Sequence, residues 1–157
     1  MGVSGCGKST VGGVLHGRVG WPLCEGDDLH PPANVAKMAA GHALTDEDRR
    51  PWLALVRAWI DARVAADGAG LVTCSALKRA YRDVLREPHV VFVHLDGTRE
   101  QLLARLAGRH GHFMPAALLD SQLATLEKPD ADEQAIRVDI AAPAAVQANE
   151  IVDILRL

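Results

Sequence analysis

The first residues of the chain are of the types and spacing that bind phosphate groups. Gly2 to Ser9, written GVSGCGKS, match the pattern G-x-x-x-x-G-K-S/T. Its glycines let successive backbone N–H groups converge on phosphate oxygens, and a helix beginning at Lys8 would add its positive dipole end. Lys8 is placed to reach the β- and γ-phosphates, and the hydroxyl of Ser9 to ligate Mg²⁺. We therefore predict a site for ATP and Mg²⁺ at Gly2, Val3, Ser4, Gly5, Cys6, Gly7, Lys8, Ser9 and Thr10, with Ser9 as the metal ligand.

Other motifs narrow the class of phosphate-binding protein. A GTPase would carry N-K-x-D for the guanine base, and the sequence has no such run. Asp67 to Gly70 formally match D-x-x-G, but they fall between an expected helix and an expected strand, which favours a simple turn. The chain is also too short for the machinery of motor or transporter ATPases. Kinases of small metabolites or nucleotides remain.

Helical and strand-like segments alternate along the chain that must position this loop. Apolar periodicity and the placing of proline and glycine predict helices over 8–19, 31–40, 51–66, 78–86, 99–108, 115–126 and 142–155. Short apolar runs predict strands at 22–25, 71–74, 90–95 and 138–140. The pattern indicates an α/β fold of three layers, a P-loop NTPase fold with a parallel sheet of about five strands. We expect one kinase domain over 1–157, with a small helical lid at about 105–125.

The beginning of the chain departs from this scheme. A phosphate-binding loop normally follows a buried strand, yet only Met1 precedes Gly2. Either the true start lies upstream of Met1, which is the interpretation that we favour, or the sheet forms without its first strand.

Composition excludes several other classes of protein. The 157 residues carry a formal net charge of −3, so no overall basic field attracts nucleic acid or an anionic membrane. The three cysteines form no C-x-x-C pair, which favours reduced thiols over disulfides or a zinc site. Neither a membrane-spanning run nor a signal peptide is evident. We expect a cytoplasmic enzyme that acts on a small molecule.

Beyond the loop, the sequence resembles the gluconokinase family, a group of P-loop kinases related to shikimate and adenylate kinases. The resemblance runs over nearly the whole chain in separate blocks, which are together more specific than the loop alone. It implies transfer of the γ-phosphate of ATP to D-gluconate, giving 6-phospho-D-gluconate. These blocks are EGDDLHP from Glu25, NVAKM from Asn34, DEDRRPWL from Asp46, CSALKRAYRD from Cys74, HFMP from His112, and Ser121-Gln122 with Leu126-Glu127.

Phosphoryl transfer needs a group that positions the attacking hydroxyl. Asp27 follows an expected strand, where α/β sheets place their ligands. We predict that its carboxylate orients the hydroxyl and accepts its proton; a helix-capping or metal-bridging acid is the alternative. Asp28 is the weaker candidate, because the family pattern varies there.

A sugar acid also needs cations for its carboxylate and polar groups for its hydroxyls. Arg49, Lys78, Arg79 and Arg82 are candidates from the residues themselves, and the family pattern adds His30 and Lys37. The alternative is a solvated basic helix face. Lys78, Arg79 and Arg82 cannot all point one way on a helix, so we expect Arg49 and one or two of the others to bind substrate.

Arg105 and Arg109 lie four residues apart on one expected helix face. In related kinases such arginines belong to a lid that closes over the phosphates, so we predict catalytic roles for both beside Lys8 and Asp27. Ordinary solvated arginines are the alternative. The resemblance also implies that a homodimer can form, although the sequence shows no interface.

Two alternative functions stay open at this stage. One is a kinase of another small acid or of a nucleoside monophosphate. The other is a nucleotide-binding P-loop protein without turnover, which would follow if the absent strand disturbs the loop.

Overall fold

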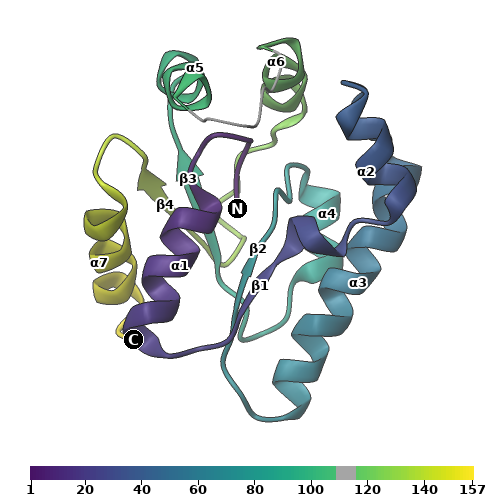
Figure 1. Cartoon of the computed structure of the whole chain (residues 1–157). Helices are drawn as coiled ribbons and strands as arrows, with labels where there is room; N and C mark the ends of the chain where they lie inside the picture. The colour runs from purple at the N-terminus through teal and green to yellow at the C-terminus, as the bar shows by residue number, and fades with distance from the viewer. Residues whose placement is uncertain (109–115) are drawn as a thin grey trace.

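Helices and strands alternate in the computed structural model, which describes residues 1–108 and 116–157. This alternation confirms the predicted α/β class (Figure 1). The elements are α1 (Lys8–Val19), β1 (Leu23–Glu25), the 3₁₀ helix η1 (Gly26–Leu29), α2 (Pro32–Ala39), α3 (Asp46–Ala65), β2 (Leu71–Thr73), α4 (Arg79–Leu85), β3 (Phe92–Asp96), α5 (Arg99–Ala107), α6 (Ala116–Thr125), β4 (Ala135–Asp139) and α7 (Ala144–Leu155).

The strands form two parallel pairs within the described residues. In one pair Cys24 of β1 lies opposite Val72 of β2, and in the other His94 of β3 lies opposite Arg137 of β4. Met1 lies between the pairs, because its amino group donates to the carbonyl of Val93 and its own carbonyl accepts from the N–H of Leu95. The two pairs thus stand on either side of the chain's first residue.

Helices cover both faces of the strands. On one face α1 packs beside α7, and Val11, Leu15 and Ile151 join a buried apolar cluster (Figure 1). On the other face α3 packs against α4, and Trp52 and Leu85 belong to a second cluster. The predicted three layers are therefore present. Within the part of the chain that the structure describes, no helix is long and apolar enough to cross a membrane.

Two elements, α3 and β4, begin three or more residues before their predicted bounds. Helix α3 begins five residues before Pro51, since the hydroxyl of Thr45 accepts from the N–H of Asp48 and the Asp48 carboxylate accepts from the N–H of Thr45. This capping box starts the helix upstream of the proline. Strand β4 begins at Ala135, before the predicted 138–140. It pairs with β3 on one side, and its exposed residue Arg137 interrupts the apolar run from which the strand was predicted.

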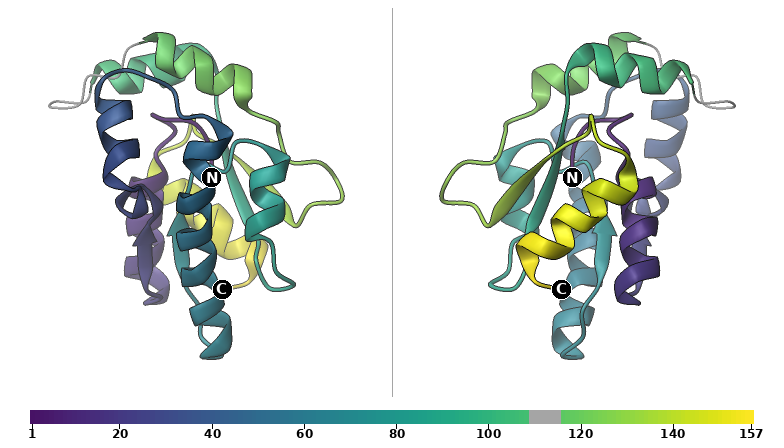
Figure 2. Two further views of the ribbon diagram at one scale, coloured as in Figure 1. Left: turned by 90° about the vertical axis from the view of Figure 1, so that its right-hand side faces the viewer. Right: turned by 90° about the vertical axis from the view of Figure 1, so that its left-hand side faces the viewer.

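The carboxyl ends of the strands and the phosphate-binding loop lie at the same end of the molecule. Helices α5 and α6 lie together over this end (Figure 2). Because the carboxyl ends of parallel strands are where α/β proteins bind ligands, this end positions the candidate site.

Candidate active site

The phosphate-binding loop adopts backbone angles that require glycine at several positions. Gly5 has φ 84°, and a Cβ atom there would lie 2.9 Å from Cγ of Leu106. Gly7 has φ 100° and ends the loop, after which the N–H of Val11 donates to its carbonyl as the first turn of α1 forms. The loop is therefore pressed against α5 and leads directly into a helix N-terminus, as phosphate binding needs.

Lys8 lies folded over this loop. Its Nζ donates to the carbonyl oxygens of Gly2 at 3.0 Å and Val3 at 3.2 Å. These contacts hold a positive charge at the mouth of the loop, where the outer phosphates of a nucleotide would lie.

Ser9 belongs to a small group of oxygen atoms at the ends of β1 and β2. Its hydroxyl donates to Oε2 of Glu25 at 2.8 Å, and the hydroxyl of Thr73 donates to the same oxygen at 2.6 Å. Mg²⁺ prefers such hard oxygen ligands and is commonly held by one or two protein groups together with phosphate oxygens. Ser9 and Glu25 therefore fit a magnesium site, and Glu25 is a residue that our prediction missed. Its signal was its place at the end of a strand, ahead of Asp27.

Two side chains from outside the loop fix its backbone. Arg105 of α5 donates through Nη1 to the carbonyl of Cys6 at 3.1 Å and through Nη2 to the carbonyl of Ile140. Gln122 of α6 accepts from the N–H of Ser4 at 2.7 Å. Arg105 thus ties the loop to the segment after β4. Gln122 was not predicted as a site residue, since only the fold brings it across more than a hundred residues of sequence.

Asp27 lies in η1, directly after β1. The indole N–H of Trp52 donates to the carbonyl of Gly26 at 2.7 Å, which anchors this short helix on α3. A Cβ atom on Gly26 would lie 2.1 Å from the carbonyl oxygen of Thr73, so η1 packs directly on the end of β2. Asp27 itself is exposed at the surface of this anchored turn.

His30 brings η1, α2 and α3 together. Its ring stacks on Trp52 with centroids 4.4 Å apart, and Nδ1 lies 3.4 Å from Nδ2 of Asn34. Burial lowers the pKa of His30, the nearby Asp27 carboxylate raises it, and Arg49 lowers it. These opposing influences show that Asp27, His30 and Arg49 share one neighbourhood.

Arg49 and Lys78 both lie close to the ring of Tyr81. Each cation lies 5.6 Å from the centre of the ring. Lys78 also pairs with Asp46 at 2.8 Å, and the hydroxyl of Tyr81 donates to the same carboxylate at 2.5 Å. The buried Nε of Arg49 has no hydrogen-bond partner among the described residues. Arg49 is thus held by stacking and keeps hydrogen-bonding capacity for an anion.

Lys37 is engaged within α2 and α3. Its Nζ pairs with Oδ2 of Asp48 at 2.5 Å, and this hydrogen bond, together with the N–H of Thr45, lowers the pKa of Asp48 to about 2. Lys37 therefore braces the segment that carries Asn34 and His30.

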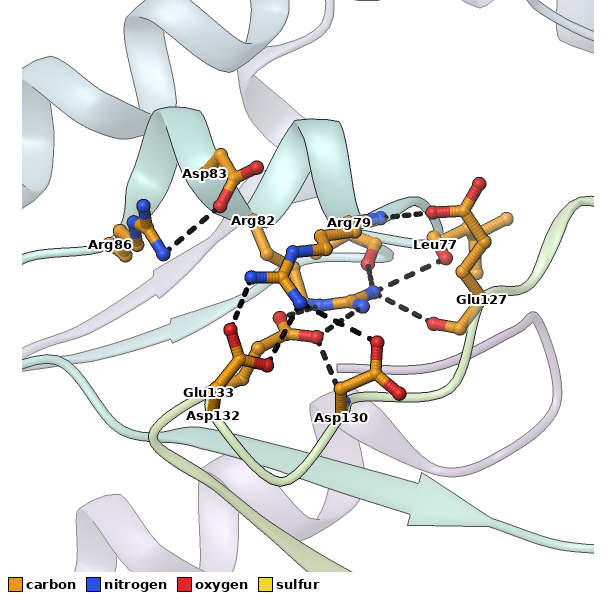
Figure 3. A network of polar contacts seen from close by, with 10 residues as sticks. Leu77, Arg79, Arg82, Asp83, Arg86, Glu127, Asp130, Asp132 and Glu133 are labelled. Carbon is orange, nitrogen blue, oxygen red and sulfur yellow. Dashed lines mark hydrogen bonds and ion pairs between the residues drawn. The ribbon is translucent and has the colours of Figure 1, made fainter.

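Arg79 and Arg82 point toward the loop before β4 (Figure 3). The side chain of Arg82 is only 1% exposed and pairs through two nitrogens with Glu133, at 2.5 and 2.8 Å. Arg79 pairs with exposed Asp132 at 2.5 Å, and its N–H donates to Glu127 at 2.6 Å. These contacts join α4 to the segment between α6 and β4.

Comparison with known proteins places this geometry in a family. The family model for shikimate kinase matches residues 4–154. A gluconokinase of Gluconobacter oxydans (strain 621H) is 56% identical over 140 residues, which cover 88% of this chain and 79% of that relative. The chain belongs to the gluconokinase family. Two solved structures agree with this. The unliganded sugar kinase from Janibacter sp. HTCC2649 superposes with a TM-score of 0.93 at 47% identity, covering 99% of this chain and 91% of the other. The gluconokinase from Sinorhizobium meliloti 1021 gives 0.82 at 44% identity, covering 99% and 93%.

The P-loop fold of the gluconokinase family is thus confirmed, while the roles of individual residues stay predictions. The structure brings Asp27, His30 and Arg49 into one neighbourhood, with Lys78 beside Arg49. Arg79 and Arg82 instead contact acidic residues and carbonyls of the protein. Arg109 and the predicted His-Phe-Met-Pro turn lie outside the described residues.

Proposed function

We propose that the protein is a gluconokinase, which transfers the γ-phosphate of ATP to D-gluconate and gives 6-phospho-D-gluconate and ADP. The observation that carries this proposal is a phosphate-binding loop together with an exposed carboxylate directly after β1 and an arginine whose Nε has no hydrogen-bond partner among the described residues. Lys8, Asp27 and Arg49 supply these three parts. The identity of 56% to a curated gluconokinase supports the choice of acceptor.

Each part has a distinct chemical task. The loop N–H groups and Lys8 bind the phosphates and stabilise the charge that develops on them during in-line transfer. Asp27 orients the attacking hydroxyl and accepts its proton. Arg49 pairs with the carboxylate of the sugar acid, and His30 is a candidate donor to its hydroxyls. Mg²⁺ would neutralise part of the phosphate charge, with Ser9 as a ligand from this chain and Glu25 beside it.

Arg105 supports this site from the far side of the loop. Its bond to the carbonyl of Cys6 holds that oxygen toward α5. A lid role for Arg105 and Arg109, a homodimer and a cytoplasmic location stay proposals. The free thiols of the three cysteines among the described residues support the last of these.

The decisive experiment measures ADP release from Mg-ATP with and without D-gluconate. The chain is compared with Asp27→Asn and with Asp28→Asn, a matched control because both acids are exposed in η1. We expect gluconate-dependent turnover that Asp27→Asn reduces by roughly 10²–10⁴-fold and Asp28→Asn leaves nearly unchanged.

Other results would redirect the assignment. Shikimate, other small acids and nucleoside monophosphates are tested as acceptors in the same assay. Faster turnover with one of these than with gluconate would make that compound the assigned substrate in place of gluconate. ATP binding without turnover on any acceptor would leave a nucleotide-binding protein.

A further inference from the structure

The 75–78 segment, which joins β2 to α4, has an unusual backbone conformation. Ala76 has φ 44°, in the left-handed region, although it is not glycine, and its side chain is fully buried. The other described non-glycine residues with positive φ, Asp67 and Arg156, are exposed and lie just after helices. A Cβ atom disfavours this conformation roughly fivefold to thirtyfold. Such outliers persist where surrounding contacts hold them, and they cluster at functional sites.

Arg82 holds this segment by its carbonyl groups. Its Nη1 donates to the carbonyls of Ala76 at 3.1 Å, Leu77 at 3.3 Å and Glu127 at 2.9 Å (Figure 3). The N–H of Glu127 in turn donates to the carbonyl of Leu77 at 2.8 Å. The remaining side of the guanidinium pairs with Glu133, which fixes its orientation. The backbone on both sides of Ala76 is therefore tied to one buried cation.

The same segment contacts both halves of the proposed site. At its start, the carbonyl of Ser75 accepts from the N–H of Gly2 in the phosphate-binding loop at 3.2 Å. At its end, Lys78 is the N-cap residue of α4, and its Nζ lies 5.6 Å from the centre of the Tyr81 ring. Arg49 lies at the same distance from that ring. The backbone of the segment thus sets where the cations proposed for the acceptor lie relative to the phosphates.

We propose that Arg82 is a positioning residue for the acceptor. It holds Ala76 in the left-handed conformation and thereby places Lys78 relative to the phosphate-binding loop. We assign it this role in place of direct contact with the substrate, because its side chain is 1% exposed. The inference rests on the proposed function, since it deepens the description of the acceptor site.

The test removes the carbonyl bonds in two ways. The double variant Arg82→Met/Glu133→Leu removes them without leaving an unpaired buried charge. Arg82→Lys keeps a cation beside Glu133, but its three N–H donors cannot serve the carboxylate and three carbonyls together. Each is made with Ala76 and with Ala76→Gly. Asp132→Asn is the matched control, because it breaks the neighbouring exposed pair of α4 with the same loop.

Initial rates are measured over ranges of D-gluconate and of ATP concentration, well below the Tm of every variant. We expect the KM for gluconate to rise roughly tenfold or more in both Arg82 variants. The KM for ATP should change less than about threefold, because Arg105 and Gln122 hold the phosphate-binding loop separately. Adding Ala76→Gly should recover at least about threefold in the KM for gluconate, since glycine adopts left-handed backbone unaided. Asp132→Asn should leave both KM values near those of the unsubstituted chain.

Equal changes in the two KM values, or no recovery with Ala76→Gly, would overturn the proposal and leave Arg82 a role in stability alone. Failure of the proposed function has a different signature, which is absence of gluconate-dependent turnover in the unsubstituted chain. The same KM measurements are then made with any acceptor that is turned over. Without one, amide hydrogen exchange at Ala76 and Leu77 decides. Exchange roughly tenfold faster in the Arg82 variants than in Asp132→Asn would support the proposal, and equal exchange would overturn it.

Discussion

Glu133→Gln should destabilise the protein strongly, because it breaks the buried ion pair between Arg82 of α4 and Glu133, just before β4. The two side chains are 1% and 5% exposed and form two parallel bonds of 2.5 and 2.8 Å (Figure 3). Arg82 also donates through Nη1 to the carbonyls of Ala76, Leu77 and Glu127. The variant leaves a buried guanidinium with no opposite charge.

The size of the effect follows from this burial. Removing one partner of a buried pair costs about 3–5 kcal/mol, which in a chain of this length lowers the Tm by about 6–20 °C at 2–4 °C per kcal/mol. The matched control is Asp132→Asn. The Asp132 side chain, which pairs with Arg79, is 62% exposed, so this substitution should cost at most about 1 kcal/mol of stability.

Urea denaturation measures the free energy of unfolding of both variants and of the double variant Arg82→Met/Glu133→Leu. We expect the double variant to be more stable than Glu133→Gln, because no unpaired charge remains. A loss below about 1 kcal/mol for Glu133→Gln would refute the reasoning. It would show that water reaches the guanidinium or that the loop before β4 moves to solvate it.

Three other variants test the loop and a buried histidine. Gly5→Ala should lower the Tm by several degrees and weaken ATP binding, because φ is 84° and the new Cβ would lie 2.9 Å from Leu106; calorimetry and nucleotide titration measure both. Lys8→Met should lower kcat/KM by roughly 10²–10³-fold in the ADP-release assay with an unchanged Tm, and a loss in folding would contradict this. Burial lowers the pKa of His94 to about 4 in the folded chain, against 6.5 for an unperturbed imidazole. The unfolded chain therefore binds the extra proton between pH 4 and 6.5, so stability should rise with pH across this window. His94→Gln should flatten that rise in urea denaturation, and an unchanged slope would show that other groups cause it.

The local elements of the fold were largely predictable from the sequence. Helix α1 begins and ends at its predicted residues because the glycine-rich loop starts it and Gly20, with φ 71°, ends it. The bounds of α3 and β4 were wrong for reasons that also lie in local chemistry. The Thr45–Asp48 capping box starts the helix upstream of Pro51, which had been predicted as its first residue, and an edge strand keeps polar residues that a search for apolar runs leaves out.

Roles that depend on distant contacts could not be predicted. Gln122 reaches Ser4 and Arg105 reaches Cys6 only because α5 and α6 fold over the loop. Arg82 carries the same charge as its neighbour Arg79, and nothing in the helical spacing tells that one is buried against Glu133 and the other lies at the surface.

The sequence by itself determined the phosphate-binding loop, the alternation of helices and strands, and the family, because each rests on residues close together in the chain. Tertiary structure alone decided which cations pair with acidic residues of the protein, because burial and pairing are set by segments fifty or more residues apart.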